Sequence, residues 1–276
     1  MLICPHCAQP LVRGTHTLKC ASGHSFDIAS SGYCNLLTGS RPGEKTGDSK
    51  EMVLARRTFL DSGAYQPLRE AVCSRAQELA PQDCARVLDA GCGEGYYTRA
   101  VAQTLADSGR RLTMIGADIS KSATQYAAKR DKLTDYITAS TYHMPIADHS
   151  ADLILSLFAP APAQELARML AEGGAVLQVV PGAEHLWELK QAVYDTPYRN
   201  REDKHTLEGF ALTDRRKLTY LKKICGTEQI RALFSMTPYA HRTPRAGLER
   251  LNALEQITVT LSFVLLTFEK KNNSGE

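Results

Sequence analysis

The chain has 276 residues and a formal net charge of +3, with 43% hydrophobic and 23% charged residues. This composition is typical of a globular protein with room for one α/β domain and one small module, and the charge permits a nucleic-acid partner without requiring one. No apolar run is long enough to span a membrane, and no signal-peptide pattern opens the chain. We therefore expect a cytoplasmic protein with no membrane partner, whose eight cysteines stay reduced.

Two close pairs of potential metal ligands lie near the N-terminus. With twelve residues between the pairs, they are Cys4, Cys7, Cys20 and His24. Zinc prefers four tetrahedral sulfur and imidazole ligands, and this pattern can supply them with no position left for water. We expect a structural zinc site in a module over residues 1–37, whose small core needs the metal to fold. His6 and His16 are rival ligands with less suitable spacing.

Residues 38–80 are expected to form a linker followed by a helical connector. The stretch 38–48 is rich in glycine, which favours a loop. A helix is predicted to begin at Ser49, whose hydroxyl can cap it, and a second helix to cover residues 67–79. These helices lead into the first strand of a larger domain, which we expect over residues 81–276.

A glycine-rich turn after the first strand of this domain carries the strongest functional signal. The strand ends at Asp89. The glycines of the turn, which precede a helical pattern, are Gly91, Gly93 and Gly95. Glycine permits positive φ and lets a ligand lie against bare backbone. A dinucleotide-binding fingerprint would need a further glycine where Tyr96 stands, so the loop is of a different kind.

A second carboxylate completes the pattern. An apolar strand over residues 112–117 ends in Asp118, which can accept both hydroxyls of a ribose. The spacing of the glycines between Asp89 and this second acid resembles that of S-adenosylmethionine-dependent methyltransferases. In that family the glycine loop contacts the methionine part of the donor and the second acid holds the ribose. A turn that merely connects a strand to a helix is the alternative.

Helical and strand patterns alternate along the rest of the chain. Helices are predicted over residues 96–106, 121–130, 165–170 and 227–234. Strands are predicted over residues 112–117, 136–139, 151–158, 175–180, 218–224 and 257–268, with an exit turn at Gly173-Gly174. This order indicates an α/β fold with helices on both faces of a sheet. The resemblance to methyltransferases implies a Rossmann-like class I methyltransferase sheet with a reversed last strand, and the Cys/His pattern adds a small N-terminal zinc-ribbon module.

Further segments make the resemblance more specific. They are residues 24–27, 32–37, 63–67, 181–186 and 235–238. Together with the zinc pattern and the glycine loop, they resemble the 23S ribosomal RNA guanine-N1-methyltransferase family over nearly the whole chain. The resemblance implies transfer of a methyl group from S-adenosylmethionine to N1 of a guanine in a 23S rRNA hairpin. Two branches of that family modify neighbouring guanines, and residues 48–52 favour the branch typical of Gram-negative bacteria.

The resemblance also assigns residues. Those that match its donor contacts are Tyr65, Gly91, Gly93, Glu94 and His185, and those carried over from the wider methyltransferase pattern are Asp89 and Asp118. A positively charged cleft beside the zinc module would hold the RNA. Arg56 and Arg57 are candidates for phosphate contacts there, with an ordinary solvated helix face as the alternative. A homodimer is expected by the same resemblance.

Guanine N1 carries a proton at neutral pH, and this proton must leave before or during methyl transfer. Because N1 lies on the Watson–Crick edge, the base must also be opened or swung out of its stack. His185 and Asp48 are candidate general bases by chemistry alone, and water is the alternative. Residues 156–160 lack the Asn/Asp-Pro-Pro-aromatic pattern of exocyclic-amine methylation, and the absence of a Pro-Cys pair argues against attack at pyrimidine C5.

Two other functions stay open at this point. The chain could be a small-molecule methyltransferase whose zinc module only adds stability, or an inactive zinc-ribbon protein that binds RNA. The intact glycine loop and Asp118 count against the inactive protein. A small-molecule methyltransferase would transfer no methyl group to RNA. An inactive RNA-binding protein would fail to bind S-adenosylmethionine.

Overall fold

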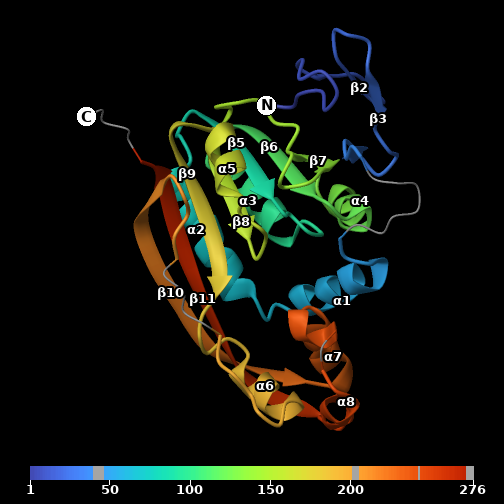
Figure 1. The fold of residues 1–276 in the computed structure, drawn as a ribbon, viewed down its shortest axis with the longest axis vertical. Coiled ribbons are helices and arrows are strands. Elements are labelled where there is room, and N and C mark those ends of the chain that lie inside the picture. The colour runs from blue at the N-terminus through green and yellow to red at the C-terminus, as the bar shows by residue number, and fades with distance from the viewer. Residues whose placement is uncertain (40–46, 201–204, 242, 272–276) are drawn as a thin grey trace.

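The computed structural model describes residues 1–39, 47–200, 205–241 and 243–271. Figure 1 shows a large twisted sheet in the middle of the molecule, with a small N-terminal ribbon beyond one end and a group of helices beyond the other. Within the described residues, no helix combines the length and the apolar character needed to cross a bilayer.

The N-terminal segment folds as a small antiparallel sheet that is joined to the large one. Its strands are β1 (Val12–Arg13), β2 (Thr17–Lys19) and β3 (Ser25–Asp27). The next strand, β4 (Cys34–Asn35), leaves this ribbon and pairs in parallel with β7 (Thr134–Thr138). Buried Leu18 and Leu36 belong to the same apolar cluster as residues of the large sheet. The ribbon is therefore attached to the large sheet by backbone pairing and by apolar packing.

Two helices connect the ribbon to the large sheet. α1 (Lys50–Asp61) begins where predicted, because the Ser49 hydroxyl accepts a hydrogen bond from the Met52 amide at 3.3 Å. α2 (Gln66–Leu79) begins one residue before its predicted start, with a proline in its first turn. α1 packs against α7 (Thr227–Ser235) at the lower end of the sheet (Figure 1).

The large sheet has eight strands in the order β10-β11-β9-β8-β5-β6-β7-β4. Those not yet bounded are β5 (Cys84–Ala90), β6 (Arg111–Asp118), β8 (Ala151–Leu157), β9 (Leu170–Pro181), β10 (Phe210–Cys225) and β11 (Gln256–Lys270). β11 runs antiparallel to both its neighbours, and the other pairs are parallel. The structure thus confirms the α/β sheet and its reversed last strand.

Helices cover both faces of this sheet. The remaining ones are α3 (Tyr96–Asp107), α4 (Lys121–Arg130), α5 (Ala163–Met169), α6 (Trp187–Val193), η1 (Pro238–His241) and α8 (Arg245–Asn252). Side chains alternate along β5: Val87 belongs to the apolar cluster that contains α2 and α3, and Leu88 to the cluster that contains α5. The predicted layers are confirmed.

Some elements differ from the sequence predictions. α6 and α8 lie where no helix was predicted, and β10 begins at Phe210 rather than at residue 218. The predicted exit turn at Gly173-Gly174 is wrong, because both residues lie within β9 where its pairing register with β8 shifts. Glycine is required there, since a Cβ on Gly174 would lie 2.8 Å from the Asp152 carbonyl oxygen.

Four parallel strands end together at one edge of the sheet. β5 leads into the glycine loop, β6 ends at Asp118, β8 is followed by Phe158, and β9 ends at Pro181. In open α/β sheets, ligands bind outside the carboxyl ends of the strands. The topology therefore gathers residues that are far apart in the sequence at the place where a ligand is expected.

Candidate methyl-transfer site and zinc site

The ribbon contains a cluster of potential metal ligands whose ligand atoms all lie within 4.8 Å of one another: Cys4, Cys7, Cys20 and His24. Nδ1 of His24 is 3.5 Å from Sγ of Cys4 and 3.4 Å from Sγ of Cys20. The sulfurs of Cys7 and Cys20 are 3.6 Å apart. A tetrahedral zinc site has ligand–ligand distances of about 3.5–3.8 Å, because Zn–S is about 2.3 Å and Zn–N about 2.0 Å. The four side chains fit a zinc ion, and His6 lies outside the cluster.

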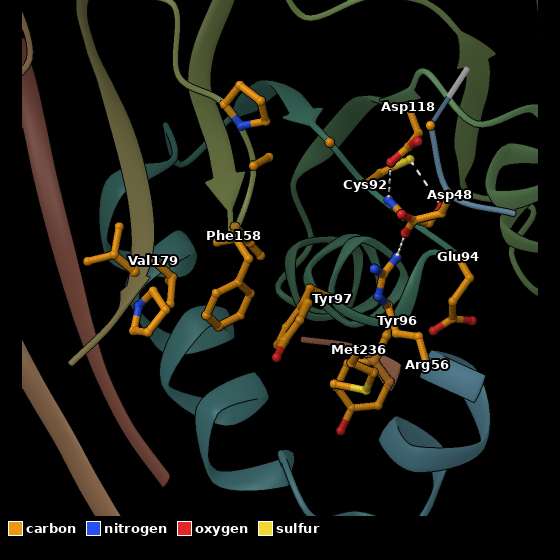
Figure 2. Close-up of a pocket in the computed structure, with 18 of the residues that line it drawn as sticks. Asp48, Arg56, Cys92, Glu94, Tyr96, Tyr97, Asp118, Phe158, Val179 and Met236 are labelled. Atoms are coloured by element: carbon orange, nitrogen blue, oxygen red, sulfur yellow. Dashed lines mark hydrogen bonds and ion pairs between the residues drawn. The ribbon is translucent and has the colours of Figure 1, made fainter. Parts of the chain in front are cut away.

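A cavity of about 680 Å³ opens at the carboxyl edge of the large sheet (Figure 2). Of the residues predicted to contact the donor, those that line it are Tyr65, Gly91, Gly93, Glu94, Asp118 and His185. Asp89 does not line it: this residue is 1% exposed, and its carboxylate accepts a hydrogen bond from the Thr98 hydroxyl at 2.7 Å. Burial raises the pKa of Asp89 to about 7. The cavity thus gathers all but one of the residues predicted to contact S-adenosylmethionine.

The glycine loop has a backbone that favours glycine. Gly91 and Gly93 have φ of 97° and 56°. A Cβ on Gly91 would lie 2.3 Å from the Cβ of Ala159, in the loop after β8. A Cβ on Gly93 would meet nothing nearer than the guanidinium of Arg56, at 3.9 Å. Gly91 therefore allows two loops to pack closely, whereas Gly93 borders open space in the cavity.

Two acidic side chains flank the loop. Asp118 accepts a hydrogen bond from the Gly93 amide at 2.9 Å, and burial raises its pKa. Glu94 is 1% exposed and forms an ion pair with Arg130 of α4, which also pairs with Asp61 of α1. Burial raises the Glu94 pKa despite this arginine, and the Oε1 atom has no hydrogen-bond partner among the described residues. Glu94 therefore ties two helices to the loop and keeps one buried acceptor unused.

Tyr65 and His185 form a hydrogen-bonded pair deep in the cavity. The Tyr65 hydroxyl oxygen is 3.3 Å from Nε2 of His185, and the backbone amide of Ser262 donates to Nδ1 at 3.3 Å. Since Nδ1 accepts, Nε2 carries the proton and donates to Tyr65. Burial lowers the His185 pKa to about 3, so the ring is neutral. Neither nitrogen is free to accept a proton, which argues against His185 as the general base.

Asp48, the other candidate base, lines the cavity and forms an ion pair with Arg56, with Nη1 and Oδ2 2.5 Å apart. The two arginines of α1 separate. Arg56 extends into the cavity beside the glycine loop (Figure 2), whereas Arg57 lies 3.5 Å from Asp61 and over the ring of Tyr126. The helical turn directs adjacent side chains about 100° apart, which separates the two arginines, and the phosphate contact expected of each stays a prediction.

An apolar part of the cavity was not predicted from the sequence. Figure 2 shows Tyr97, Phe158 and Met236 around the space next to the glycine loop. Tyr97 lies on α3, Phe158 follows β8, and Met236 follows α7. The available signal was a large apolar residue placed directly after a strand that ends at the ligand-binding edge. Periodicity alone assigns such a residue to the core.

Comparison with known proteins identifies the family. The model of the RlmA N-terminal zinc ribbon matches residues 2–40, and that of a methyltransferase domain matches residues 87–178. A 23S rRNA (guanine(748)-N(1))-methyltransferase of Streptomyces fradiae is 38% identical over 70% of this chain and 67% of its own length. A candidate 23S rRNA (guanine-N(1)-)-methyltransferase of Micromonospora griseorubida is 32% identical over 97% of this chain and 96% of its own length. The chain belongs to the 23S rRNA (guanine-N1)-methyltransferase family.

A solved structure supports the fold of this methyltransferase. The YcgJ protein of Bacillus subtilis aligns with a TM-score of 0.51 over 74% of this chain and 99% of its own length, at 17% sequence identity. At that identity the likeness shows the fold alone. The family membership identifies an S-adenosylmethionine-dependent enzyme with a zinc ribbon, as the sequence predicted. It leaves the inactive RNA-binding protein without support.

Proposed function

We propose that this chain transfers the methyl group of S-adenosylmethionine to N1 of a guanine in a hairpin loop of 23S rRNA, in the cytoplasm. The observation that carries the proposal is the cavity, which gathers the predicted donor residues in a chain of this family. The guanine-N1 target is taken from the names of the relatives from S. fradiae and M. griseorubida. A cavity of about 680 Å³ lies within the usual range for small-molecule sites.

When bound, S-adenosylmethionine supplies an activated methyl group on a sulfonium. In our proposal the backbone at Gly91 and Gly93 approaches its methionine part, and Asp118 accepts its ribose hydroxyls. Because Asp118 also accepts the Gly93 amide, the loop and the carboxylate are held together before the donor arrives. Glu94 offers its unused Oε1 atom as a further acceptor, and Asp89 supports the loop from outside the cavity.

The Tyr65–His185 pair positions the donor rather than moving a proton. His185 donates its Nε2 proton to the Tyr65 oxygen, so the hydroxyl proton of Tyr65 is available to an acceptor in the cavity. A carboxylate at the methionine end of the donor is such an acceptor. The neutral imidazole therefore fixes the direction in which Tyr65 donates.

The reaction forms the N1–C bond, breaks the S–C bond and releases the N1 proton. With both nitrogens of His185 engaged, we assign that proton to the Asp48 carboxylate, and solvent is the alternative acceptor. The ion pair with Arg56 fixes the position of this carboxylate at the cavity wall. Holding the two reactants in line supplies most of the acceleration, since proximity and orientation can contribute about 7–11 kcal/mol.

The organisation of the chain belongs to the same proposed function. We divide it into a zinc module over residues 1–37, a connector over 38–80 and a methyltransferase domain over 81–276, acting as a homodimer that widens the RNA cleft. Both arginines of α1, Arg56 and Arg57, stay candidates for phosphate contact, and Arg56 also lines the cavity. Sedimentation equilibrium tests the dimer, and a monomer at micromolar concentration would contradict it.

A hairpin transcript tests the target atom. Incubation with S-adenosylmethionine should place a methyl group that stops primer extension at one guanine, because N1 lies on the pairing edge. Inosine at that position keeps N1–H and lacks the exocyclic amine, so it should still be methylated, whereas adenine should not. Methylation that is lost with inosine would show that the exocyclic amine is needed, as the target or for recognition of the base, and mass spectrometry of the nucleoside formed from guanine separates the two. Donor turnover without labelled RNA would favour a small-molecule substrate.

A further inference from the structure

Phe158 combines two unfavourable features that suggest a role beyond packing. Its φ is 57°, in the left-handed region that a bulky side chain rarely adopts. Its side chain is also 44% exposed, and it points into the cavity (Figure 2). Strained backbone at a functional site persists where the surrounding structure fixes it and the strain serves a purpose.

The loop after β8 holds Phe158 firmly. The Phe158 amide donates to the Val179 carbonyl of β9 at 3.0 Å, and the Ser156 hydroxyl donates to the Ala159 carbonyl at 3.3 Å. Ala159 packs closely over Gly91, since a Cβ added to Gly91 would lie 2.3 Å from the Cβ of Ala159. The backbone therefore cannot relax without disturbing the glycine loop, and the ring is presented from a rigid support.

Other aromatic rings surround part of the Phe158 ring. The centroid of Tyr97 is 6.4 Å away, and that of Phe263 is 5.9 Å away in an edge-on arrangement. The Tyr97 hydroxyl is buried and has no hydrogen-bond partner among the described residues, although Tyr97 lines the cavity. An exposed aromatic ring and an unused buried hydroxyl side by side form a site for a planar ligand with polar edges.

We propose that Phe158 stacks on the target guanine after it has swung out of the RNA, and thereby positions N1 for methyl transfer. The inference rests on the function proposed above, which supplies the guanine. The guanine must leave its stack to expose N1, and an aromatic ring compensates for the lost stacking. The adenosine of the donor belongs at the other side of the glycine loop, where Asp118 accepts the ribose. Phe158 is therefore available to the target guanine, which is the second planar group in the reaction.

The test compares Phe158→Leu with Phe158→Tyr in the full-length, zinc-loaded enzyme. Leucine keeps the apolar volume but cannot stack, whereas tyrosine can. Loss of one stacked base weakens binding by about 5- to 150-fold. We expect Phe158→Leu to raise the RNA concentration for half-saturation within this range, with S-adenosylmethionine affinity unchanged within twofold. Phe158→Tyr should stay within threefold of the wild type.

An RNA with an abasic site in place of the target guanine separates stacking from folding defects. The affinity difference between wild type and Phe158→Leu should disappear on this RNA, because the base that stacks is gone. Leu133→Ala is the matched control, since Leu133 is 47% exposed but precedes β7 at the opposite edge of the sheet. It should bind both RNAs as the wild type does.

Three outcomes would overturn the proposal. Equal losses of affinity on the intact and the abasic RNA would show that Phe158 acts on the fold. Weaker donor binding with unchanged RNA binding would assign the ring to S-adenosylmethionine. Intact RNA binding and transfer by Phe158→Leu would leave the ring without a role. A wild-type enzyme that labels no RNA would instead refute the proposed function, and with it the guanine as the occupant.

Discussion

Adding one methyl group at either of two glycines separates packing from ligand binding in the glycine loop. Gly91→Ala and Gly93→Ala both place a side chain on left-handed backbone, which costs about 1–2 kcal/mol. At Gly91 the new Cβ also lies 2.3 Å from that of Ala159, and relieving such overlap costs a further ~1–3 kcal/mol. The free energy of unfolding should therefore fall by about 2–5 kcal/mol for Gly91→Ala and about 1–2 kcal/mol for Gly93→Ala.

Donor binding by the folded protein should show a separate effect. The Cβ of Gly93→Ala would stand in open cavity space, 3.9 Å from the Arg56 guanidinium. If S-adenosylmethionine lies against this backbone, the added alanine methyl group occupies the space that the donor needs. We expect Gly93→Ala to weaken S-adenosylmethionine binding at least about tenfold, which corresponds to about 1.4 kcal/mol, in a protein that keeps its zinc.

Urea denaturation of the zinc-loaded proteins measures the free energies of unfolding, and calorimetric titration measures the donor affinity. Zinc content serves as the control for the ribbon. Equal destabilisation by the two variants would refute the packing of Gly91 against Ala159. Wild-type donor affinity in Gly93→Ala would refute the placement of the donor against the loop.

Further predictions concern the zinc site, the buried acid and the proton acceptor. Cys7→Ser should release zinc and impair RNA methylation more than donor binding, and an unchanged metal content would remove Cys7 from the ligand set. Burial raises the Asp89 pKa to about 7, above about 3.9 when unfolded. The folded state therefore binds the extra proton, and between pH 4 and 7 the free energy of unfolding should fall as pH rises, by at most about 4 kcal/mol. In urea denaturation, the free energy of unfolding of Asp89→Asn should not show this fall with pH. A pH slope identical to that of the wild type would contradict the prediction. Asp48→Asn should lower the single-turnover rate constant of methyl transfer by roughly 10²–10⁴-fold if this carboxylate takes the N1 proton. A change below tenfold would assign the proton to solvent.

Much of the fold was predictable because local signals and tertiary structure agree. Ser49 caps α1 through its hydroxyl. β6, which ends at Asp118, lies between two helices in the sequence and pairs in parallel with both its neighbours, as a parallel sheet requires. Other elements gave no such signal. α6 has seven residues, too few to establish a helical period, and β10 carries many charged residues because much of the strand is exposed. Gly173-Gly174 suggested a turn, but both residues lie within β9, where Gly174 allows a close contact with β8.

The site was predictable only in part. The glycine loop has a spacing that points to a ligand, and Asp118 follows from its place at a strand end. By contrast, Arg56 and Arg57 are adjacent in sequence, and only the packing of α1 decides which one enters the cavity. The hydrogen bonds that engage both nitrogens of His185 come from Tyr65 and from the β11 backbone, far away in the sequence. Contacts of this kind depend on the assembled sheet.

The most direct test of the account is methyl transfer from labelled S-adenosylmethionine to unmodified 23S rRNA, with the product nucleoside identified by mass spectrometry and mapped to its hairpin. The account predicts N1-methylguanosine at one loop guanine, and the mapped position assigns the enzyme to one of the two branches of its family. RNA that stays unlabelled while the protein binds the donor tightly, or label on any other atom, would contradict it.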